Sequence, residues 1–325
     1  MVSLTTAEKA LKDYYLGVVA EQLNTGVNPF LAKIAQTSAD VWGKQIVKMV
    51  PYGVNGGVGA GTETGALPTA AGNNYERFTL DLKNLYGRIE ISDKAMRASL
   101  STEGAFVNLL NAEMEGLLKA SKFNLGRMLF GDGSGKLCGV SSVSGTTYTV
   151  DDTRNLMVGM VVDLYESDGT EVAKGRTVTA VDRATKAVTL SGTSAADVAG
   201  GGLYLQNSRG LELTGLGAIF SDSDTLYGLE RKDNAWLNPI ITESVGTLSE
   251  LTVQKAIDQV EEHSGGKINF IICSWGVKRA LYNVLTKYRQ CDTVDLIGGA
   301  RAITFNGIPV VADRFCPEGS MYLLN

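Results

Sequence analysis

The sequence predicts an α+β fold, in which strands and helices occupy separate stretches of the chain. Three observations lead to this class. Two strands flank a glycine-rich tip within residues 45–92, a long amphipathic helix ends near residue 130, and a run of short strands fills residues 141–206. A chain of 325 residues with 44% hydrophobic content can bury one large core or two to three smaller ones.

The first element expected is helical. In residues 6–35, apolar side chains from Leu11 to Leu23 recur at helical spacing. Gly26 and Pro29 interrupt the pattern, so we expect two short pieces that belong partly to an extended arm. Such a terminus is ordered only when another part of the structure holds it.

The next elements form a long two-stranded ribbon. An apolar strand, Ile46 to Tyr52, enters the glycine-rich tip at residues 53–61, and a second strand returns over residues 75–83. The returning strand alternates, which places Phe78, Leu80 and Leu82 on one face. Because an isolated two-stranded ribbon is marginal in water, we expect another copy of the chain to cover this face.

A long helix follows the ribbon. Ser92 is a good N-cap for helical territory, and Gly104 leads into an amphipathic stretch that stops at the glycine-rich residues 131–135. Its apolar stripe consists of Phe106, Leu110, Met114, Leu117, Leu125 and Met128.

Residues 141–206 differ in character from the rest. Short β-rich runs alternate there with turn signals such as Asp168-Gly169, which indicates a small all-β barrel or sandwich. Glycine- and serine-rich stretches flank the block, so we interpret it as an inserted domain.

The C-terminal third predicts a mixed domain. The capping-box pattern from Thr247 to Glu250 precedes a helix that Gly265 stops. A buried strand over 268–273 and a helix over 277–288 come next. A hairpin then turns at Asn306-Gly307, and a last strand covers residues 321–325.

Composition narrows the function. The net charge of −5 argues against a dedicated DNA-binding surface, and no apolar run is long enough to span a bilayer. The N-terminus lacks a secretory pattern. The four cysteines contain no C-x-x-C pair, so we expect reduced thiols in a cytosolic product.

No motif in the sequence indicates catalysis. The stretch Gly131 to Lys136 has the wrong spacing for a phosphate-binding loop, and the tip at residues 53–61 does not match G-x-G-x-x-G. His263 is the only histidine and lies at a predicted helix end, where a cation complements the dipole. There is no G-x-S-x-G elbow, and Cys273 follows a buried strand. We therefore expect no catalytic residue, no metal site and no cofactor.

Taken in order, these pieces resemble the major capsid proteins of tailed bacteriophages, which have the Hong Kong 97-type fold. The resemblance covers most of the chain outside residues 141–206. It rests on the glycine-rich tip with Leu67-Pro68, on the long helix that ends in Leu129-Phe-Gly-Asp-Gly-Ser-Gly, and on Phe305-Asn-Gly-Ile-Pro-Val-Val-Ala-Asp. None of these segments is a catalytic signature, and the resemblance lies in the order in which they follow one another along the chain.

The resemblance implies a division of the chain. Residues 1–44 would be the N-terminal arm, 45–92 the extended loop, 93–140 the peripheral domain with its spine helix, 141–206 an insertion domain, and 207–325 the axial domain. The chain departs from the family pattern because it has no long N-terminal scaffolding segment and because it stops at Asn325, before the usual return strands.

The resemblance also implies a function: self-assembly into the icosahedral head shell that encloses the phage genome. The subunit itself would be the main partner, in hexamers and pentamers. Scaffolding, portal and decoration proteins, and non-specifically contacted double-stranded DNA, would be further partners, with no membrane. The expected location is the virion, after assembly in the host cytoplasm. Covalent lysine–asparagine links occur in some relatives, and Lys48, Lys83 and Asn84 lie in or near the ribbon.

In this hypothesis the ribbon of one subunit lies across the long helix of its neighbour. The contact residues expected on the extended loop are Glu63, Leu67, Phe78, Leu80 and Leu82. Those expected on the spine helix are Phe106, Leu110, Met114 and Leu117.

Three alternatives stay open from the residues. The chain could form an encapsulin-like nanocompartment shell around a protein cargo. Residues 141–206 could instead carry an adhesion or glycan-binding role. An enzyme is the least favoured class, because the chain lacks a catalytic signature.

Overall fold

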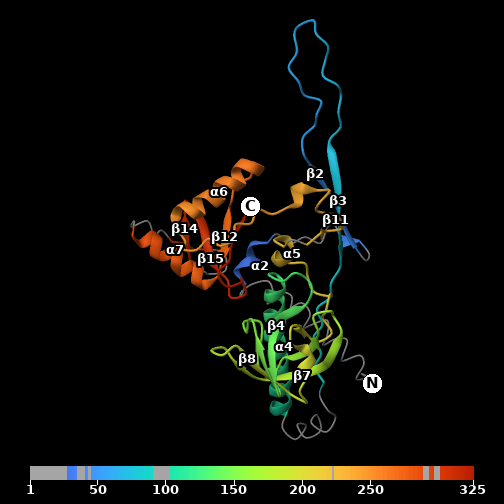
Figure 1. Cartoon of the computed structure of the whole chain (residues 1–325), viewed down its shortest axis with the longest axis vertical. Helices are drawn as coiled ribbons and strands as arrows, with labels where there is room; N and C mark the ends of the chain where they lie inside the picture. Colours follow the sequence, from blue (N-terminus) through green and yellow to red (C-terminus); the bar gives the residue numbers. More distant parts are fainter. Residues whose placement is uncertain are drawn as a thin grey trace.

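The computed structural model describes residues 28–34, 41–42, 45–90, 103–221, 223–287, 293–295 and 301–325. A long ribbon, a closed β-barrel and a sheet carrying two helices are arranged around one central helix, α4 (Figure 1). The fold is α+β, as the sequence predicts.

The short helix α2, Pro29–Lys33, opens the described part of the chain. Asn28 caps it, because its side-chain oxygen accepts hydrogen bonds from the N–H groups of Phe30 at 2.9 Å and Leu31 at 3.3 Å. Pro29 therefore begins a helix, a position where its missing N–H costs nothing. The rest of the helical stretch expected over residues 6–35 lies almost entirely outside the described residues.

The ribbon consists of β2, Gln45–Tyr52, paired in antiparallel fashion with β3, Asn74–Asp81. Its register opposes Ile46 to Leu80 and Lys48 to Phe78. A two-residue strand, β1, Val41–Trp42, adds to the other edge of β2, so the ribbon is three-stranded at its base. Beyond the strands, residues 53–73 extend far from the rest of the molecule (Figure 1).

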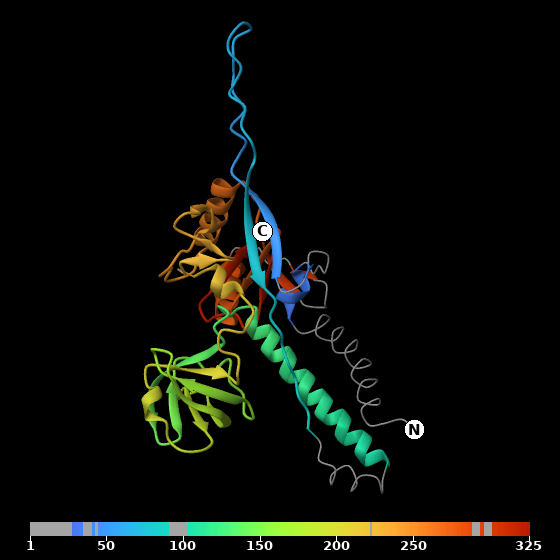
Figure 2. The same cartoon turned by 90° about the vertical axis from the view of Figure 1, so that its right-hand side faces the viewer.

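Helix α4, Glu103–Met128, runs beside the chain that follows β3 (Figure 2). The two segments are close: a Cβ atom placed on Gly87 would lie 2.9 Å from the side chain of Leu117. The C-terminal end of α4 is its best buried part, with Phe123, Arg127 and Met128 almost free of solvent contact. The N-cap expected at Ser92 lies outside the described residues.

A closed barrel follows α4, with strand order β4-β5-β8-β7-β6-β9. Its strands are β4 Lys136–Ser144, β5 Thr147–Val150, β6 Val161–Tyr165, β7 Glu171–Asp182, β8 Ala187–Leu190 and β9 Gly202–Leu205, with a 3-10 turn η1 at Ala196–Val198. The barrel has its own core, which includes Tyr148, Leu164 and Val178. Its first strand begins at Lys136, five residues before the boundary expected at 141, because the glycine-rich turn that ends α4 leads directly into β4.

The C-terminal domain is built on a five-stranded sheet of order β13-β14-β15-β12-β16. The strands are β13 Thr293–Asp295, β14 Arg301–Phe305, β15 Ile308–Ala312, β12 Phe270–Cys273 and β16 Met321–Leu324. Only the β12–β15 pair is parallel. Helices α6, Glu250–Ser264, and α7, Trp275–Lys287, pack on one face of this sheet, while α2 and Phe130 pack on the other.

Two local predictions can be checked closely in this domain. Asn306 and Gly307 both have positive φ, of 50° and 81°, as a type I′ hairpin turn requires. The helix cap is shifted, however. Ser249, and not Thr247, caps α6, because its hydroxyl oxygen accepts a hydrogen bond from the N–H of Thr252 at 3.2 Å.

Short elements connect the barrel to this domain. They are α5 Leu216–Ile219, β10 Thr225–Leu226, β11 Leu229–Glu230 and the 3-10 turn η2 Ala235–Leu237. β10 and β11 form a tight hairpin whose turn contains Tyr227 and Gly228, both with positive φ. This hairpin and η2 lie against the base of the ribbon, which they contact through stacked rings and a backbone hydrogen bond.

Candidate assembly surface

One face of the ribbon is covered by its own chain. The ring of Trp236 stacks on Tyr52 at 5.3 Å and on Phe78 at 5.9 Å between centroids, and Phe78 also contacts Tyr227 at 5.3 Å. In addition, the N–H of Thr79 donates a hydrogen bond to the carbonyl oxygen of Tyr227 at 2.9 Å. The ribbon base is thus fixed by an aromatic cluster within the subunit.

This cluster changes the expectation for the face that carries Phe78. Phe78 and Leu80 are only half-buried, and Leu82, beyond the end of β3, is 40% exposed. Tyr227 and Trp236 are a partner that the sequence does not reveal, because they lie about 150 residues away and neither belongs to a recognisable motif.

The opposite face of the ribbon is open and largely apolar, with exposed Arg77 and half-buried Thr79 as its polar members. Strand pairing places Val47, Met49 and Tyr75 on this face, and their exposed fractions are 38%, 63% and 52%. Pro51 belongs to the same face and is also exposed. An apolar strip of this kind on a projecting ribbon is typical of a protein–protein contact.

The tip of the ribbon is exposed almost throughout. In residues 53–73, only Gly57 is half-buried, and the large apolar side chains Val54, Val58 and Leu67 are 84%, 89% and 91% exposed. Glu63 is exposed in the same segment. Few hydrogen bonds support the tip: Asn55 donates to the side-chain oxygen of Asn73 at 3.0 Å, and Gly57 and Gly65 close two local turns.

The residues of α4 that the sequence analysis expects at the subunit contact are only partly described. The side chains of Phe106 and Leu110 lie outside the described residues, whereas Met114 and Leu117 are half-buried. Leu117 faces the chain around Gly87 of the same subunit, so a part of the stripe already has a partner.

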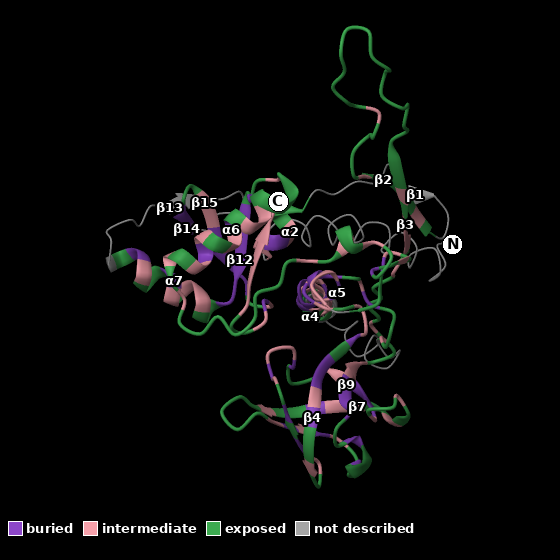
Figure 3. Ribbon diagram, turned by 45° about the horizontal axis from the view of Figure 1, so that its top comes forward, coloured by how far each residue is buried: buried purple, intermediate pink, exposed green. Residues whose placement is uncertain are grey.

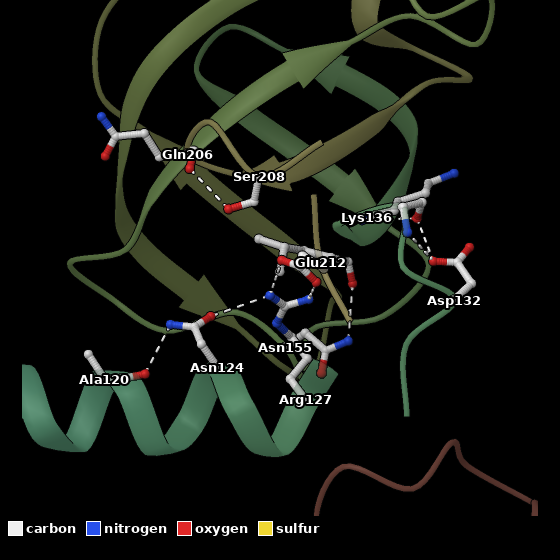
Figure 4. A network of polar contacts seen from close by, with 11 residues as sticks. Ala120, Asn124, Arg127, Asp132, Lys136, Asn155, Gln206, Ser208 and Glu212 are labelled. Carbon is white, nitrogen blue, oxygen red and sulfur yellow. Dashed lines mark hydrogen bonds and ion pairs between the residues drawn. The ribbon is translucent and has the colours of Figure 1, made fainter. Parts of the chain in front are cut away.

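The barrel is anchored to α4 by a buried ion pair (Figure 4). The guanidinium of Arg127 donates to both carboxylate oxygens of Glu212, at 2.8 and 2.5 Å, and the two side chains are only 4% and 3% exposed. Asn124, one helical turn earlier, accepts a third contact from Arg127 at 3.4 Å. Glu212 lies on the segment that leaves the barrel, so this pair ties the barrel exit to the helix.

Other contacts reinforce the anchor. Lys83, at the foot of the ribbon, donates to the carbonyl oxygen of Gly210 at 3.2 Å, which joins the ribbon to the barrel exit. At the barrel entrance, Asp132 accepts hydrogen bonds from the N–H and the hydroxyl of Ser134, at 2.9 and 2.6 Å. The Gly131 to Lys136 stretch is therefore a structural turn that leads into β4.

The reactive side chains that the sequence offers are placed in structural positions. Burial raises the pKa of the thiols of Cys273 and Cys316 to about 12, and it raises the pKa of Cys138 as well. His263 is exposed at the end of α6, with Nδ1 2.8 Å from the carbonyl oxygen of Gln259. Across the described ranges, no three His, Cys, Asp or Glu side chains gather as a metal site would require, and no helix could cross a membrane.

Comparisons with known proteins were made by sequence and by structure. No family model matches the sequence, and no curated protein matches it. Among solved structures, the chain is similar to a chain in the capsid asymmetric unit of cyanophage A-1(L), with a TM-score of 0.52 and 17% sequence identity. The similarity covers 92% of this chain and 71% of the cyanophage chain. This chain has the fold of a phage capsid chain.

The similarity extends over nearly the whole chain and is not confined to one domain. Two surfaces stand out on this fold: the open, largely apolar face of the ribbon and its exposed tip. In addition, the Arg127–Glu212 ion pair fixes the barrel exit to α4. The sequence identifies the ribbon and the tip, through alternation and glycine content. It misses the division of the ribbon into a covered face and an open face.

Proposed function

We propose that this chain is the major capsid protein of a tailed bacteriophage or prophage, a shell subunit and not an enzyme. The observation that carries the proposal is the fold similarity over 92% of the chain to a chain of a cyanophage capsid. The exposed apolar ribbon supports it, because a surface of this kind requires a partner.

We further propose that the fold is of the Hong Kong 97 type. Residues 1–44 would then be the N-terminal arm, 45–92 the extended loop, 93–140 the peripheral domain and 207–325 the axial domain. The closed barrel, with its independent core, would be an insertion domain on this plan.

In the proposed assembly, the ribbon of one subunit lies on the spine helix of the next. The open face with Val47, Met49 and Tyr75, together with Leu67 and Glu63 of the tip, would make the contact. Leu80 and Leu82 would border it, and Phe78 would act mainly by fixing the ribbon base to its own chain. The receiving residues would be Phe106, Leu110, Met114 and Leu117 on α4.

The main partner is the subunit itself, in hexameric and pentameric rings. Each copy both gives and receives a ribbon, so the contact joins unlike surfaces and can close into rings. Scaffolding, portal and decoration proteins are proposed as further partners. Packaged double-stranded DNA would be contacted non-specifically, which fits the net charge of −5. The site of action would be the virion, after assembly in the host cytoplasm.

The test is electron microscopy of the purified chain, expressed alone and with its neighbouring phage genes. We expect closed shells for the wild type. The double variant Met49→Asp/Tyr75→Asp should stay folded and form at least tenfold fewer shells. Its matched control is Met157→Asp/Val158→Asp on the barrel, whose side chains are similarly exposed, at 42% and 65%, and should be neutral.

Two results would overturn the proposal. A chain that stays monomeric under every assembly condition is not a shell protein. Particles that contain a protein cargo and no DNA would instead indicate a nanocompartment shell.

A further inference from the structure

The C-terminal domain presents a two-helix layer to the outside. Helices α6 and α7 lie on the same face of the sheet (Figure 3). Their inward sides bury Val253 and Ile257 of α6 and Leu281 and Leu285 of α7 in one core. The remaining sides of both helices face away from the sheet.

The outward side of α7 is aromatic and basic. Trp275 is 60% exposed and Tyr282 is 49% exposed, and both border a shallow hollow that Lys278 and Arg279 also line. The ammonium of Lys278 lies 5.6 Å from the centroid of the Trp275 ring. Every charged residue of α7 is basic.

The outward side of α6 is complementary. Leu251, 77% exposed, supplies an apolar contact point near the N-terminus of the helix. Asp258, Glu261 and Glu262 follow along the helix and are exposed, with Lys255 as the single basic residue of α6 apart from the terminal His263. In the part of the chain that the structure describes, no ion pair joins these acids to the bases of α7.

We infer that the outward side of α7 in one copy docks on the outward side of α6 in a second copy. Exposed Trp, Tyr and Arg side chains are the residues that most often dominate binding energy at protein interfaces. The acids of α6 offer the opposite charge, which selects the partner and its orientation. Among the described residues no ion pair joins these two surfaces within one subunit, so a second copy is needed to bring them together.

The inference rests on the proposed function and assigns it a second subunit contact. The contact joins unlike surfaces, so each bound copy keeps one α6 side and one α7 side free for the next copy. Repetition therefore builds rings, and it does so through the C-terminal domain, independently of the ribbon.

Charge exchange tests the inference on the full-length chain. Lys278→Glu/Arg279→Glu and Asp258→Lys/Glu262→Lys each place like charges across the contact, and each should reduce shell yield at least tenfold in electron micrographs. The variant that carries all four substitutions restores opposite charges and should recover most of the yield. Lys174→Glu/Arg183→Glu on the barrel changes the net charge as much as Lys278→Glu/Arg279→Glu does, and this control should assemble normally.

The outcomes separate the two hypotheses. If the wild type forms no particles, the proposed function fails, and this inference fails with it. If the wild type assembles and both reversed pairs assemble equally well, the proposed function stands and the α6–α7 contact is wrong. Loss in both pairs without recovery in the fourfold variant, with all chains folded by circular dichroism, would also overturn the contact.

Discussion

The buried ion pair between Arg127 and Glu212 leads to a sharp prediction about the barrel mount. The conservative substitution Glu212→Gln keeps the side-chain volume but removes the negative charge. Arg127 then remains a cation that is 4% exposed and has no counter-ion. We expect the free energy of unfolding to fall by about 3–5 kcal/mol, the usual loss when one partner of a buried pair is removed.

The geometry explains this magnitude. Both oxygens of Glu212 accept charge-assisted hydrogen bonds, at 2.8 and 2.5 Å, whereas a glutamine offers one acceptor and turns a donor toward the other guanidinium nitrogen. The Nε atom of Arg127 already has no hydrogen-bond partner among the described residues. The surrounding protein therefore cannot compensate for a second lost contact.

Urea unfolding followed by tryptophan fluorescence measures the loss in free energy of unfolding. The three tryptophans, Trp42, Trp236 and Trp275, lie outside the barrel, so the signal follows unfolding of the rest of the chain. Hydrogen exchange of residues 206–215 then shows whether the barrel exit opens locally. The double variant Arg127→Met/Glu212→Leu is the control. It removes both charges and should be close to neutral. The reasoning is refuted if Glu212→Gln costs less than about 1 kcal/mol, or if the double variant is as unstable as the single one.

Three further predictions concern other parts of the chain. Burial raises the pKa of Asp313, and its Oδ2 atom has no partner among the described residues, so its contribution to stability should be complete below about pH 4 and fall as the pH rises through the raised value. Asp313→Asn should therefore stabilise the chain by about 1–3 kcal/mol at pH 7 and progressively less toward pH 4, as measured by urea unfolding across that range. Gly215→Ala should cost about 1–3 kcal/mol in the same assay, since the added Cβ would lie 2.4 and 2.5 Å from two carbonyl oxygens at the end of α4. Gly116→Ala should slightly stabilise the chain, because nothing lies within 4 Å of the added Cβ and alanine favours a helix. A Gly116→Ala chain less stable than the Gly215→Ala chain would contradict this account of the packing. Iodoacetamide at pH 7.5 should leave three buried thiols unmodified until urea unfolds the chain, as read by mass spectrometry: Cys138, Cys273 and Cys316.

Much of the fold follows from local signals. The alternation around Phe78 predicts β3, the glycine-rich stop after Met128 predicts the end of α4, and Asn306-Gly307 predicts the hairpin that joins β14 to β15. Each signal acts within a few residues, because backbone conformation at glycine and the alternation of side chains along a strand are local properties. For the same reason the block of short β-rich runs predicts a small all-β barrel or sandwich, and the structure shows a closed barrel.

Contacts between distant segments could not be predicted in this way. Nothing in the sequence near Phe78 indicates that Trp236 stacks on it, and nothing near Arg127 indicates that Glu212 neutralises it. A buried arginine and an exposed one look identical in a sequence. For the candidate surface the consequence is direct: the strand is predictable, but the face of it that is available to a partner depends on the tertiary contacts of the other face.

The ribbon and the two-helix layer of α6 and α7 should contribute to different steps of assembly. Ordering a residue costs about 1–2 kcal/mol, and the tip at residues 53–73 has little burial of its own to offset that cost. If the proposed assembly is right, this tip depends on the receiving surface of a neighbour, whereas α6 and α7 already rest on a core of their own. We expect Met49→Asp/Tyr75→Asp to block shells yet still allow small rings, detectable by mass photometry. Lys278→Glu/Arg279→Glu should reduce the yield of rings at least tenfold, because the ribbon contact alone must first offset the cost of ordering the tip. If the ribbon variant forms no rings and the helix variant does, the order of the two contacts in assembly is the reverse.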